Sequence, residues 1–323
     1  MSLDRPRIAV LTSGGDAPGM NAAIRAVVRC AIFSGADIVG IEHGYEGLLA
    51  GDFRPLAVGD VGGILDRGGT FLGTSRSDRF MTPEGVLEGA EILRSADCTG
   101  LVVIGGDGSY RGAAELSAVG MPTAGLPGTI DNDIAGTDTS IGFDTALNTV
   151  VEAIGKIRDT ASSHERTFVI EVMGRTSGIL ATYAGLAAGG DCILVPEVEW
   201  CLEEVCETVA MGQRRGKIHS IIILAEGAGH AFALAEDLSK TCGHDVRAVV
   251  LGHVQRGGSP SAFDRILASR LGEKAVRSLL AGESSVAIGL KGAEVCSYPL
   301  SEAYATQHPL RREIYALSGI LAR

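Results

Sequence analysis

The chain of 323 residues carries a formal net charge of -11 and contains 46% hydrophobic and 21% charged residues. This length and composition predict a globular protein of one or two domains. The negative charge and the lack of a long Lys/Arg run argue against nucleic acid or an anionic membrane surface as a partner. No apolar run reaches the roughly 20 residues of a membrane span, and the first residues lack a signal-peptide layout, so we expect a cytoplasmic protein.

Short β-branched runs alternate with longer stretches of helical period along the chain. This alternation predicts an α/β fold with mostly parallel sheets covered by helices, and the number of strands favours two αβα-sandwich lobes over one sheet. The clearest helices span residues 21–33, 142–162 and 263–280, each expected to end at a glycine stop. The expected strands span residues 8–12, 38–41, 101–104, 123–126, 167–172, 193–195, 220–224 and 247–251.

The cysteines are odd in number, scattered along the chain, and never spaced as a Cys-x-x-Cys pair. We therefore expect buried thiols. The seven residues are Cys30, Cys98, Cys192, Cys201, Cys206, Cys242 and Cys296.

A glycine-rich turn follows the first expected strand. Residues 12–21 read Thr-Ser-Gly-Gly-Asp-Ala-Pro-Gly-Met-Asn and lead into the first helix. Bare backbone N–H groups and the positive end of that helix would then face a ligand above the strand, an arrangement that binds phosphate in many proteins. The turn indicates an anion site, with a ligand-free structural turn as the alternative.

A second glycine-rich turn, residues 105–112, follows the apolar run 101–104 and carries Asp107 among its glycines. A carboxylate beside a bound polyphosphate is repulsive unless a divalent cation lies between them, so Asp107 is predicted to bind Mg²⁺, directly or through water. The segment resembles a loosened dinucleotide-binding fingerprint, but the strict Gly-x-Gly-x-x-Gly is absent. The Gly-x-x-x-x-Gly-Lys-Ser/Thr loop of ordinary P-loop kinases is absent as well.

A cluster of acidic residues leaves the fourth expected strand in the sequence Leu-Pro-Gly-Thr-Ile-Asp-Asn-Asp, residues 126–133. If this segment stays extended, Thr129, Asp131 and Asp133 share one side. A metal or a substrate hydroxyl would relieve the repulsion between the carboxylates. Phosphoryl transfer needs a base for the attacking hydroxyl, so Asp131 is predicted as the base, Thr129 as the residue that orients it or the phosphoryl group, and Asp133 as metal support. A solvated turn rich in Asx residues is the alternative.

Six segments of the chain form a recognisable set: residues 13–21, 68–76, 105–109, 127–133, 171–175 and 251–260. In the same order, and over about residues 8–280, they resemble segments of the bacterial 6-phosphofructokinases. The resemblance implies a fold of two lobes, with residues 1–142 plus 255–305 binding ATP and Mg²⁺ and residues 143–254 plus 306–323 binding fructose 6-phosphate. It also implies a homotetramer that phosphorylates fructose 6-phosphate with ATP.

The resemblance also implies which residues hold each ligand. Arg76 and Arg175 would join Thr129 and Asp131 as catalytic residues, with Arg76 stabilising the phosphoryl group in flight. ATP would be held by Gly15, Arg76, Ser77, Gly106, Asp107, Gly108 and Ser109, with Mg²⁺ at Asp107. The sugar phosphate would be held by Thr129, Asp131, Met173, Gly174, Arg175, Glu226, His253 and Arg256, joined by Arg166 and Arg247 of a neighbouring subunit.

The choice of phosphoryl donor follows from two glycines. Relatives that use pyrophosphate carry Asp at the position of Gly108 and Lys at that of Gly128, whereas this chain keeps glycine at both. Gly108 leaves room for the α-phosphate and ribose, which favours ATP. A related transferase that uses pyrophosphate or another sugar phosphate, and a non-catalytic nucleotide-sensing subunit, are the alternatives.

A regulatory site for ADP or phosphoenolpyruvate is a further expectation from the resemblance. Val58, Gly63 and Ile218 depart from the residues that the family often carries there, and a solvated basic face is the alternative. The residues that match the family's effector site are Arg25, Arg29, Arg158, Asp191, Arg215, Lys217 and His219.

Overall fold

The computed structural model describes residues 5–243, 245–306 and 308–322. The chain forms two compact units, one of Met1–Thr145 with Arg256–His308 and one of Ala146–Gln255 with Pro309–Arg323. In the described ranges, no helix combines the length and the apolar character that crossing a bilayer requires. The ligand assigned to each unit stays a prediction.

The first unit is built on a seven-stranded sheet with the order β11-β10-β5-β4-β1-β2-β3. Its five central strands are parallel, and each edge is closed by an antiparallel pair, β2 with β3 and β10 with β11. The strands are β1 (Arg7–Ser13), β2 (Asp37–Ile41), β3 (Phe53–Pro55), β4 (Cys98–Gly105), β5 (Thr123–Pro127), β10 (Val286–Lys291) and β11 (Glu294–Pro299).

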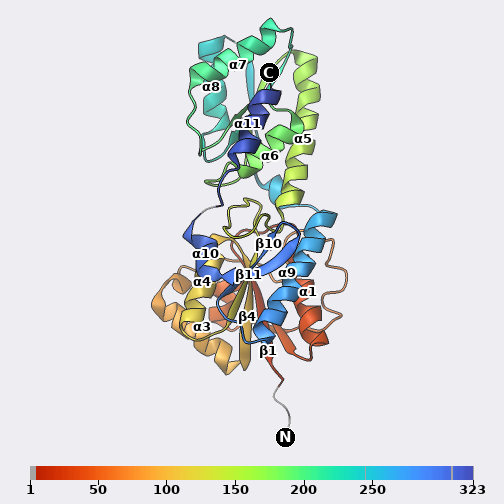
Figure 1. Ribbon diagram of the computed structural model, residues 1–323, viewed down its shortest axis with the longest axis vertical. Coiled ribbons are helices and arrows are strands. Elements are labelled where there is room, and N and C mark those ends of the chain that lie inside the picture. The colour runs from red at the N-terminus through yellow and green to blue at the C-terminus, as the bar shows by residue number, and fades with distance from the viewer. Residues whose placement is uncertain (1–4, 244, 307, 323) are drawn as a thin grey trace. The chain divides into compact units, whose positions relative to one another are not determined.

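Helices cover both faces of this sheet. Helices α1 and α9 pack on each other on one face, while α3, α4 and α10 cover the opposite face (Figure 1). The helical elements are α1 (Met20–Phe33), α2 (Gly44–Ala50), η1 (Arg79–Met81), α3 (Pro83–Ser95), α4 (Asp107–Ala118), α9 (Ala262–Leu280) and α10 (Leu300–Ala305).

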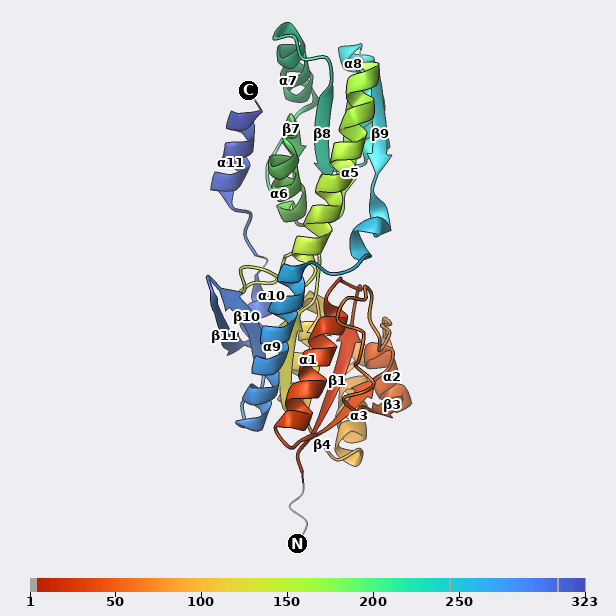
Figure 2. The same ribbon diagram turned by 90° about the vertical axis from the view of Figure 1, so that its right-hand side faces the viewer.

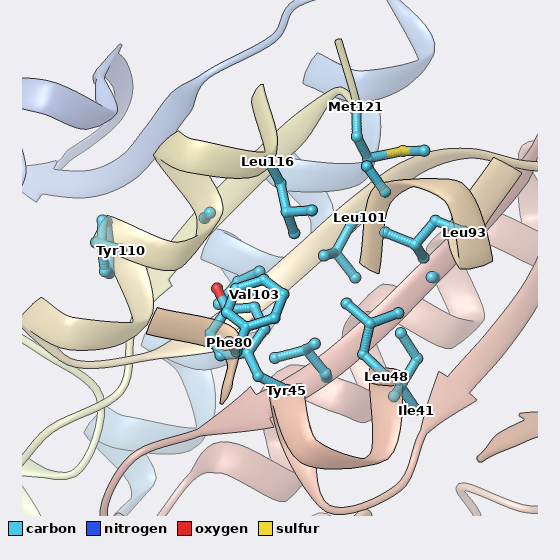
Figure 3. Close-up of a cluster of buried hydrophobic side chains, with 14 of the residues drawn as sticks. Ile41, Tyr45, Leu48, Phe80, Leu93, Leu101, Val103, Tyr110, Leu116 and Met121 are labelled. Carbon is cyan, nitrogen blue, oxygen red and sulfur yellow. The ribbon is translucent and has the colours of Figure 1, made fainter. Parts of the chain in front are cut away.

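The core on the α3 and α4 side includes buried aliphatic and aromatic side chains from β1, β2, β4 and the covering helices (Figure 3). The rings of Tyr45 and Phe80 stack within it, with centroids 4.0 Å apart and planes 12° apart. Burial of such large apolar side chains contributes about 1.5–3 kcal/mol each. The core therefore fixes the strands whose ends carry the candidate site.

The second unit holds a parallel four-stranded sheet with the order β7-β8-β6-β9. Helices α7 and α8 bury their apolar sides against one face of it. Helices α6 and α11 lie side by side (Figure 2), and α6 packs on β7 and β8. The elements are α5 (Phe143–His164), β6 (Thr167–Val172), α6 (Ile179–Ala188), β7 (Cys192–Leu194), α7 (Leu202–Arg214), β8 (Ser220–Ala225), α8 (Ala231–Cys242), β9 (Val246–Val250), η2 (Gly252–Arg256) and α11 (Arg312–Leu321).

The predicted α/β class with mostly parallel sheets is confirmed, and a strand forms at each of the eight expected places. The expected glycine stop is wrong for α5, because Glu165, with φ 54°, follows its last residue. The sequence did not reveal β3, β10 or β11. Each lies in an antiparallel edge pair, where a strand needs no long apolar run.

The expectation of seven buried thiols is confirmed only for Cys98, because Cys30, Cys192 and Cys296 are partly exposed free thiols. Cys206 and Cys242 form a disulfide that joins α7 to the end of α8, and Cys201 is exposed. The paired cysteines are 36 residues apart in sequence, and only the packing of α7 on α8 brings them together. Local spacing therefore carried no sign of this bond.

Candidate active site

Three neighbouring parallel strands of the first unit end at one edge of the sheet. Ser13 at the end of β1 pairs in register with Gly105 at the end of β4, which pairs with Pro127 at the end of β5. From β1 the chain first adds β2 on one side and later adds β4 and β5 on the other. In open α/β sheets, ligands bind at the carboxyl ends of strands where the order reverses in this way.

The two glycine-rich turns lie against each other at this edge. Gly14 and Gly19 have φ values of 84° and 107°, which favour glycine, and α1 begins directly after Gly19. A Cβ at Gly105 would lie 2.4 Å from the carbonyl oxygen of Ser13 and 2.3 Å from Oγ of Ser109. A side chain at position 105 would therefore separate the two turns.

The second turn opens α4 with the predicted metal ligand. Asp107 is the first residue of the helix, after the extended Gly106, so its carboxylate lies at the positive helix end. Gly108 is exposed, and a Cβ placed there would meet nothing within 4 Å. The carboxylate of Asp107 forms an ion pair with Arg111, from Nε to Oδ2 at 3.2 Å.

The donor set at this turn fits Mg²⁺ bound together with a polyphosphate. Among the residues that the structure describes, no group of three or more His, Cys, Asp or Glu side chains could form a metal cage. Mg²⁺ does not need one, because it is usually held by one or two carboxylates, water and substrate phosphates. The half-exposed carboxylate of Asp107 beside open Gly108 meets this requirement, and Asp133 lies half-buried in the loop after β5.

Asn21, the second residue of α1, holds the loop that leads to Arg76 and Ser77. Its Oδ1 accepts a hydrogen bond of 2.6 Å from the backbone N–H of Phe71. Its Nδ2 donates to the carbonyls of residues 67 and 68, at 3.0 and 3.1 Å. One buried amide thus fastens the start of this loop to the first turn.

Two threonines fasten the rest of the loop. The Thr12 hydroxyl donates to the carbonyl of Gly73, and the Thr74 hydroxyl donates to the carbonyl of Gly14, both at 2.8 Å. Beyond these bonds, Arg76 is exposed, while Ser77 is buried and its Oγ accepts a hydrogen bond from the N–H of Phe80 at 3.2 Å. The predicted residues of the first turn and of this loop are therefore brought together.

The loop after β5 is folded rather than extended. Asn132 has φ 52°, and the Thr129 hydroxyl accepts a hydrogen bond of 3.1 Å from the N–H of Asp131. The prediction that Thr129, Asp131 and Asp133 share one extended side is therefore wrong. The reason is Asn132, whose Oδ1 accepts bonds from both the N–H and the hydroxyl of Ser140, at 2.7 and 3.0 Å, and draws the loop closed.

The folded loop nevertheless brings the predicted catalytic pair to the second glycine turn. Thr129 and Asp131 are only 8% and 3% exposed. The Cβ of Thr129 lies 3.8 Å from the position that a Cβ would take at Gly106. A hydroxyl and a buried carboxylate thus adjoin the backbone N–H groups at the start of α4.

Arg256 lies over the first glycine turn. Its guanidinium donates to the carbonyl of Asp16 at 3.2 Å, and a Cβ at Gly15 would come within 2.2 Å of the same nitrogen. This arginine was predicted to hold a sugar phosphate. In the structure it contacts the first glycine turn, which was predicted to bind the nucleotide.

In the second unit, Glu226 supports a turn that carries three of the predicted substrate residues. Its Oε1 accepts hydrogen bonds from the N–H groups of Gly174 and Arg175, at 3.0 and 2.6 Å. Arg175 has φ 55°, an uncommon value for a residue with a side chain. Gln255, which is fully buried, accepts a bond of 3.2 Å from the N–H of Met173. Glu226 and Gln255 therefore fix this turn, from which Arg175 is exposed.

Two further predicted arginines meet on one carboxylate of the second unit. Nε of Arg166 lies 2.6 Å from Oδ2 of Asp245, and Nε of Arg247 lies 3.0 Å from its Oδ1. Burial raises the pKa of Asp245, but the two guanidiniums outweigh it, so the pKa lies below its usual value. Asp245 thus gathers the two positive charges, while His253 is exposed on η2.

The predicted effector residues fall into two groups. Asp191, only 8% exposed, forms an ion pair with Lys217 and accepts a hydrogen bond from the N–H of Ile221. Arg158 donates to the carbonyls of Ala188 and Gly189. Burial, and then the charges of Lys217 and Arg158, lower the pKa of His219, with Asp191 opposing them. The remaining pair, Arg25 and Arg29, belongs to α1 of the first unit.

The effector group of the second unit adjoins a cavity of about 660 Å³. Asp191, Arg215 and Lys217 line it together with Tyr315 of α11. Within the described part of the chain, the buried Nε of Arg158 and Nδ1 of His219 have no hydrogen-bond partner. Of the positions that depart from the family pattern, Val58 and Ile218 are exposed, and Gly63 has φ 71°.

Sequence reasoning missed the residues that hold the site without being expected to touch a ligand. Asn21 ends the first glycine-rich turn and Asn132 lies in the acidic segment, so their place in a turn was the only sign of a structural role in the sequence. Asp245 stands two residues before Arg247, a spacing that allows an ion pair. No sequence pattern around Asp264 indicates its structural role, because its hydrogen-bond partner Gly142 is 122 residues away.

Comparison with known proteins gives a consistent result. The profile of the family described as Phosphofructokinase matches residues 7–279. A protein of Shouchella clausii named ATP-dependent 6-phosphofructokinase is 55% identical over 98% of this chain and 99% of its own length. A protein of Brevibacillus brevis with the same name is 54% identical over the same shares.

A solved structure shows the same fold. The phosphofructokinase of Saccharomyces cerevisiae superimposes with a TM-score of 0.87 at 38% identity and covers 99% of this chain. This chain spans 48% of the length of that yeast chain. The matched profile, the full-length identity and the shared fold agree, and the protein described here belongs to the phosphofructokinase family.

Proposed function

We propose that this protein transfers the γ-phosphoryl group of ATP to the free primary hydroxyl of fructose 6-phosphate. The observation that carries the proposal is the packing of the buried Thr129–Asp131 loop against the glycine turn that opens α4. The full-length relatives of Shouchella clausii and Brevibacillus brevis, at 55% and 54% identity, are named for this reaction.

Asp131 acts as the general base. A primary hydroxyl is a weak nucleophile until its proton is removed, and a carboxylate within hydrogen-bond reach can accept that proton as the bond to phosphorus forms. The bond between the hydroxyl of Thr129 and the N–H of Asp131 holds the two residues in one turn. Thr129 thereby orients the base, and the exposed Arg76 and Arg175 stabilise the charge on the phosphoryl group.

The two glycine turns bind the polyphosphate of ATP. Backbone N–H groups at the starts of α1 and α4 donate to phosphate oxygens, and Oγ of Ser109 lies close to both Gly14 and Gly105. Mg²⁺ bound to Asp107 would neutralise phosphate charge, with Asp133 as support. The open space at Gly108 accepts a nucleotide, which favours ATP over pyrophosphate.

The residues of the second unit bind the sugar phosphate. The 6-phosphate is a dianion, and the arginines gathered by Asp245 provide the bidentate, charge-assisted hydrogen bonds that phosphate favours. Arg166 and Arg247 act on the site of a neighbouring subunit of a homotetramer. The turn of Met173–Arg175, supported by Glu226, holds the sugar, and His253 completes the basic set of this unit.

A regulatory anion such as ADP or phosphoenolpyruvate binds at the effector group of the second unit. Two observations support this assignment. Among the described residues, Nδ1 of His219 and Nε of Arg158 are buried without a hydrogen-bond partner, and Asp191, Arg215 and Lys217 of the same group line a cavity. Arg25 and Arg29 of another subunit would complete the site. The enzyme acts in the cytoplasm and catalyses one step of glycolysis.

Initial-rate measurements with ATP and with pyrophosphate test the proposal. Fructose 6-phosphate should be phosphorylated with ATP and Mg²⁺, with much lower rates for pyrophosphate and for tagatose or sedoheptulose phosphates. Faster turnover with pyrophosphate would overturn the assignment of the donor. Nucleotide binding without any turnover would instead identify a sensing subunit.

A further inference from the structure

Arg111 donates hydrogen bonds to both oxygens of the Asp107 carboxylate. Its Nε donates to Oδ2 at 3.2 Å, and one terminal nitrogen donates to Oδ1 at 3.3 Å. The two residues stand four apart on α4, so they share one face of the helix. The group predicted to hold a divalent cation therefore already holds a cation supplied by the chain.

Tyr304 of α10 anchors the same guanidinium from the other side. The central carbon of the guanidinium lies 4.8 Å from the centroid of the Tyr304 ring. The terminal nitrogen that reaches Asp107 also donates to the Tyr304 carbonyl at 3.1 Å. A cation over an aromatic face is attracted to the ring, so these contacts hold Arg111 in place more firmly than an ordinary exposed ion pair would.

We propose that Arg111 is a positioning residue that holds the Asp107 carboxylate in the metal-free protein and competes with the divalent cation for it. The inference rests on the proposed function, because it assumes that ATP and Mg²⁺ meet at Asp107. Arg111 then sets how strongly metal and nucleotide depend on each other for binding.

Arg111 should have opposite effects on the two ligands. A guanidinium beside a polyphosphate attracts it when no metal is present, which strengthens the binding of free nucleotide. The same charge repels Mg²⁺ and occupies the oxygens that the metal needs, which weakens metal binding. Removal of the charge should therefore weaken the binding of nucleotide without metal. It should also increase the gain in nucleotide affinity that Mg²⁺ provides.

The test is calorimetric titration of the full-length protein with ADP, once with EDTA and once with Mg²⁺. The ratio of the two dissociation constants, metal-free over metal-bound, measures the coupling between metal and nucleotide. For Arg111→Gln we expect this ratio to rise by about threefold to tenfold, which corresponds to the roughly 1 kcal/mol that a unit charge about 4 Å away contributes in water. Arg111→Lys, which keeps the charge but loses the planar fork, should give an intermediate ratio.

The chain offers a matched control. Glu273 and Arg277 on α9 form an ion pair with the same spacing, and the acid is 38% exposed in both pairs. Arg277→Gln should leave the ratio unchanged. An unchanged or lower ratio in Arg111→Gln, in a protein that still binds ADP, would overturn the inference alone. A wild-type protein that binds no ADP would overturn the proposed function and the inference with it.

Discussion

The hydroxyl of Tyr45 donates a hydrogen bond of 2.6 Å to the backbone carbonyl of Ser109. The ring that carries this hydroxyl is buried in the core of the first unit and stacks on Phe80. A Cβ at Gly112 would lie 2.7 Å from the same ring, so the glycine lets α4 approach it. The first turn of α4, which includes Asp107, is therefore attached to the core rather than to a mobile surface loop.

The first prediction concerns the base. Asp131→Ser should lower kcat by on the order of 10² to 10⁴, because a general base acts mainly in the transition state, while KM for both substrates changes little. Steady-state kinetics measures both quantities. Asp138→Asn, which changes a half-buried acid of the same loop, is the control and should keep most of the activity. Turnover of Asp131→Ser comparable to wild type would remove Asp131 from the mechanism.

The second prediction concerns the sugar phosphate. Arg166→Ser and Arg247→Ser should each raise KM for fructose 6-phosphate by about tenfold to a hundredfold, since a hydrogen bond to a charged group contributes about 1.5–3 kcal/mol. KM for ATP should change far less. The same rise for both substrates would contradict the assignment. Arg214→Ser, at an exposed arginine on α7 of the same unit, serves as the comparison.

The third prediction concerns pH and Asp264, which is fully buried. It accepts hydrogen bonds from the N–H groups of Gly142 and Thr145, at 2.9 and 2.8 Å. Burial raises its pKa to about 6 from 3.8, although these bonds oppose the rise. The folded state thus prefers the protonated acid, and this preference is fully present below pH 3.8 and is lost as the pH rises to about 6.

Asp264→Asn tests this account. The shift corresponds to about 3 kcal/mol of unfolding free energy. The stability of wild type relative to Asp264→Asn should therefore fall by up to this amount between pH 4 and pH 7, as measured by urea unfolding at each pH. A difference that stays constant with pH would show that Asp264 keeps an ordinary pKa.

The fourth prediction concerns the disulfide. Cross-linking Cys206 to Cys242 closes a chain segment of 36 residues, which limits the unfolded chain and stabilises the fold by about 3–4 kcal/mol in the chain-entropy account. Cys206→Ser should lower the unfolding free energy of the oxidised protein by about this amount, whereas Cys201→Ser should have little effect. Thiol titration of the denatured protein should find five thiols before reduction and seven after it. Seven thiols in the unreduced protein would exclude the bond.

The parallel core of the fold was predictable because its strands are short, mostly apolar runs. Residues 101–104, for example, are all apolar, all fully buried and followed by Gly105. The hairpin of β10 and β11 was not predictable in the same way. Gly289 interrupts β10, and β11 mixes polar and apolar residues along an edge, so no period identifies either strand.

The candidate site was predictable where chemistry and sequence order coincide, as in the glycine turns and the acidic loop. The contacts that shape it were not. Arg111 meets the Tyr304 carbonyl across 193 residues, and the closed form of the acidic loop depends on Asn132 reaching Ser140. Such contacts arise from the packing of helices and from the left-handed backbone conformation of one residue. A local sequence pattern predicts neither.

The bonds of Asn21 have a consequence for communication within the first unit. Asn21, Arg25 and Arg29 stand four residues apart, so they follow one stripe along α1. Any small shift of α1 along its axis moves the side-chain amide of Asn21. This amide is hydrogen-bonded to residues 67, 68 and 71, so they should move with it. If a ligand binds the two arginines and shifts α1, the movement would therefore reach the loop that leads to Arg76 through the side chain of Asn21.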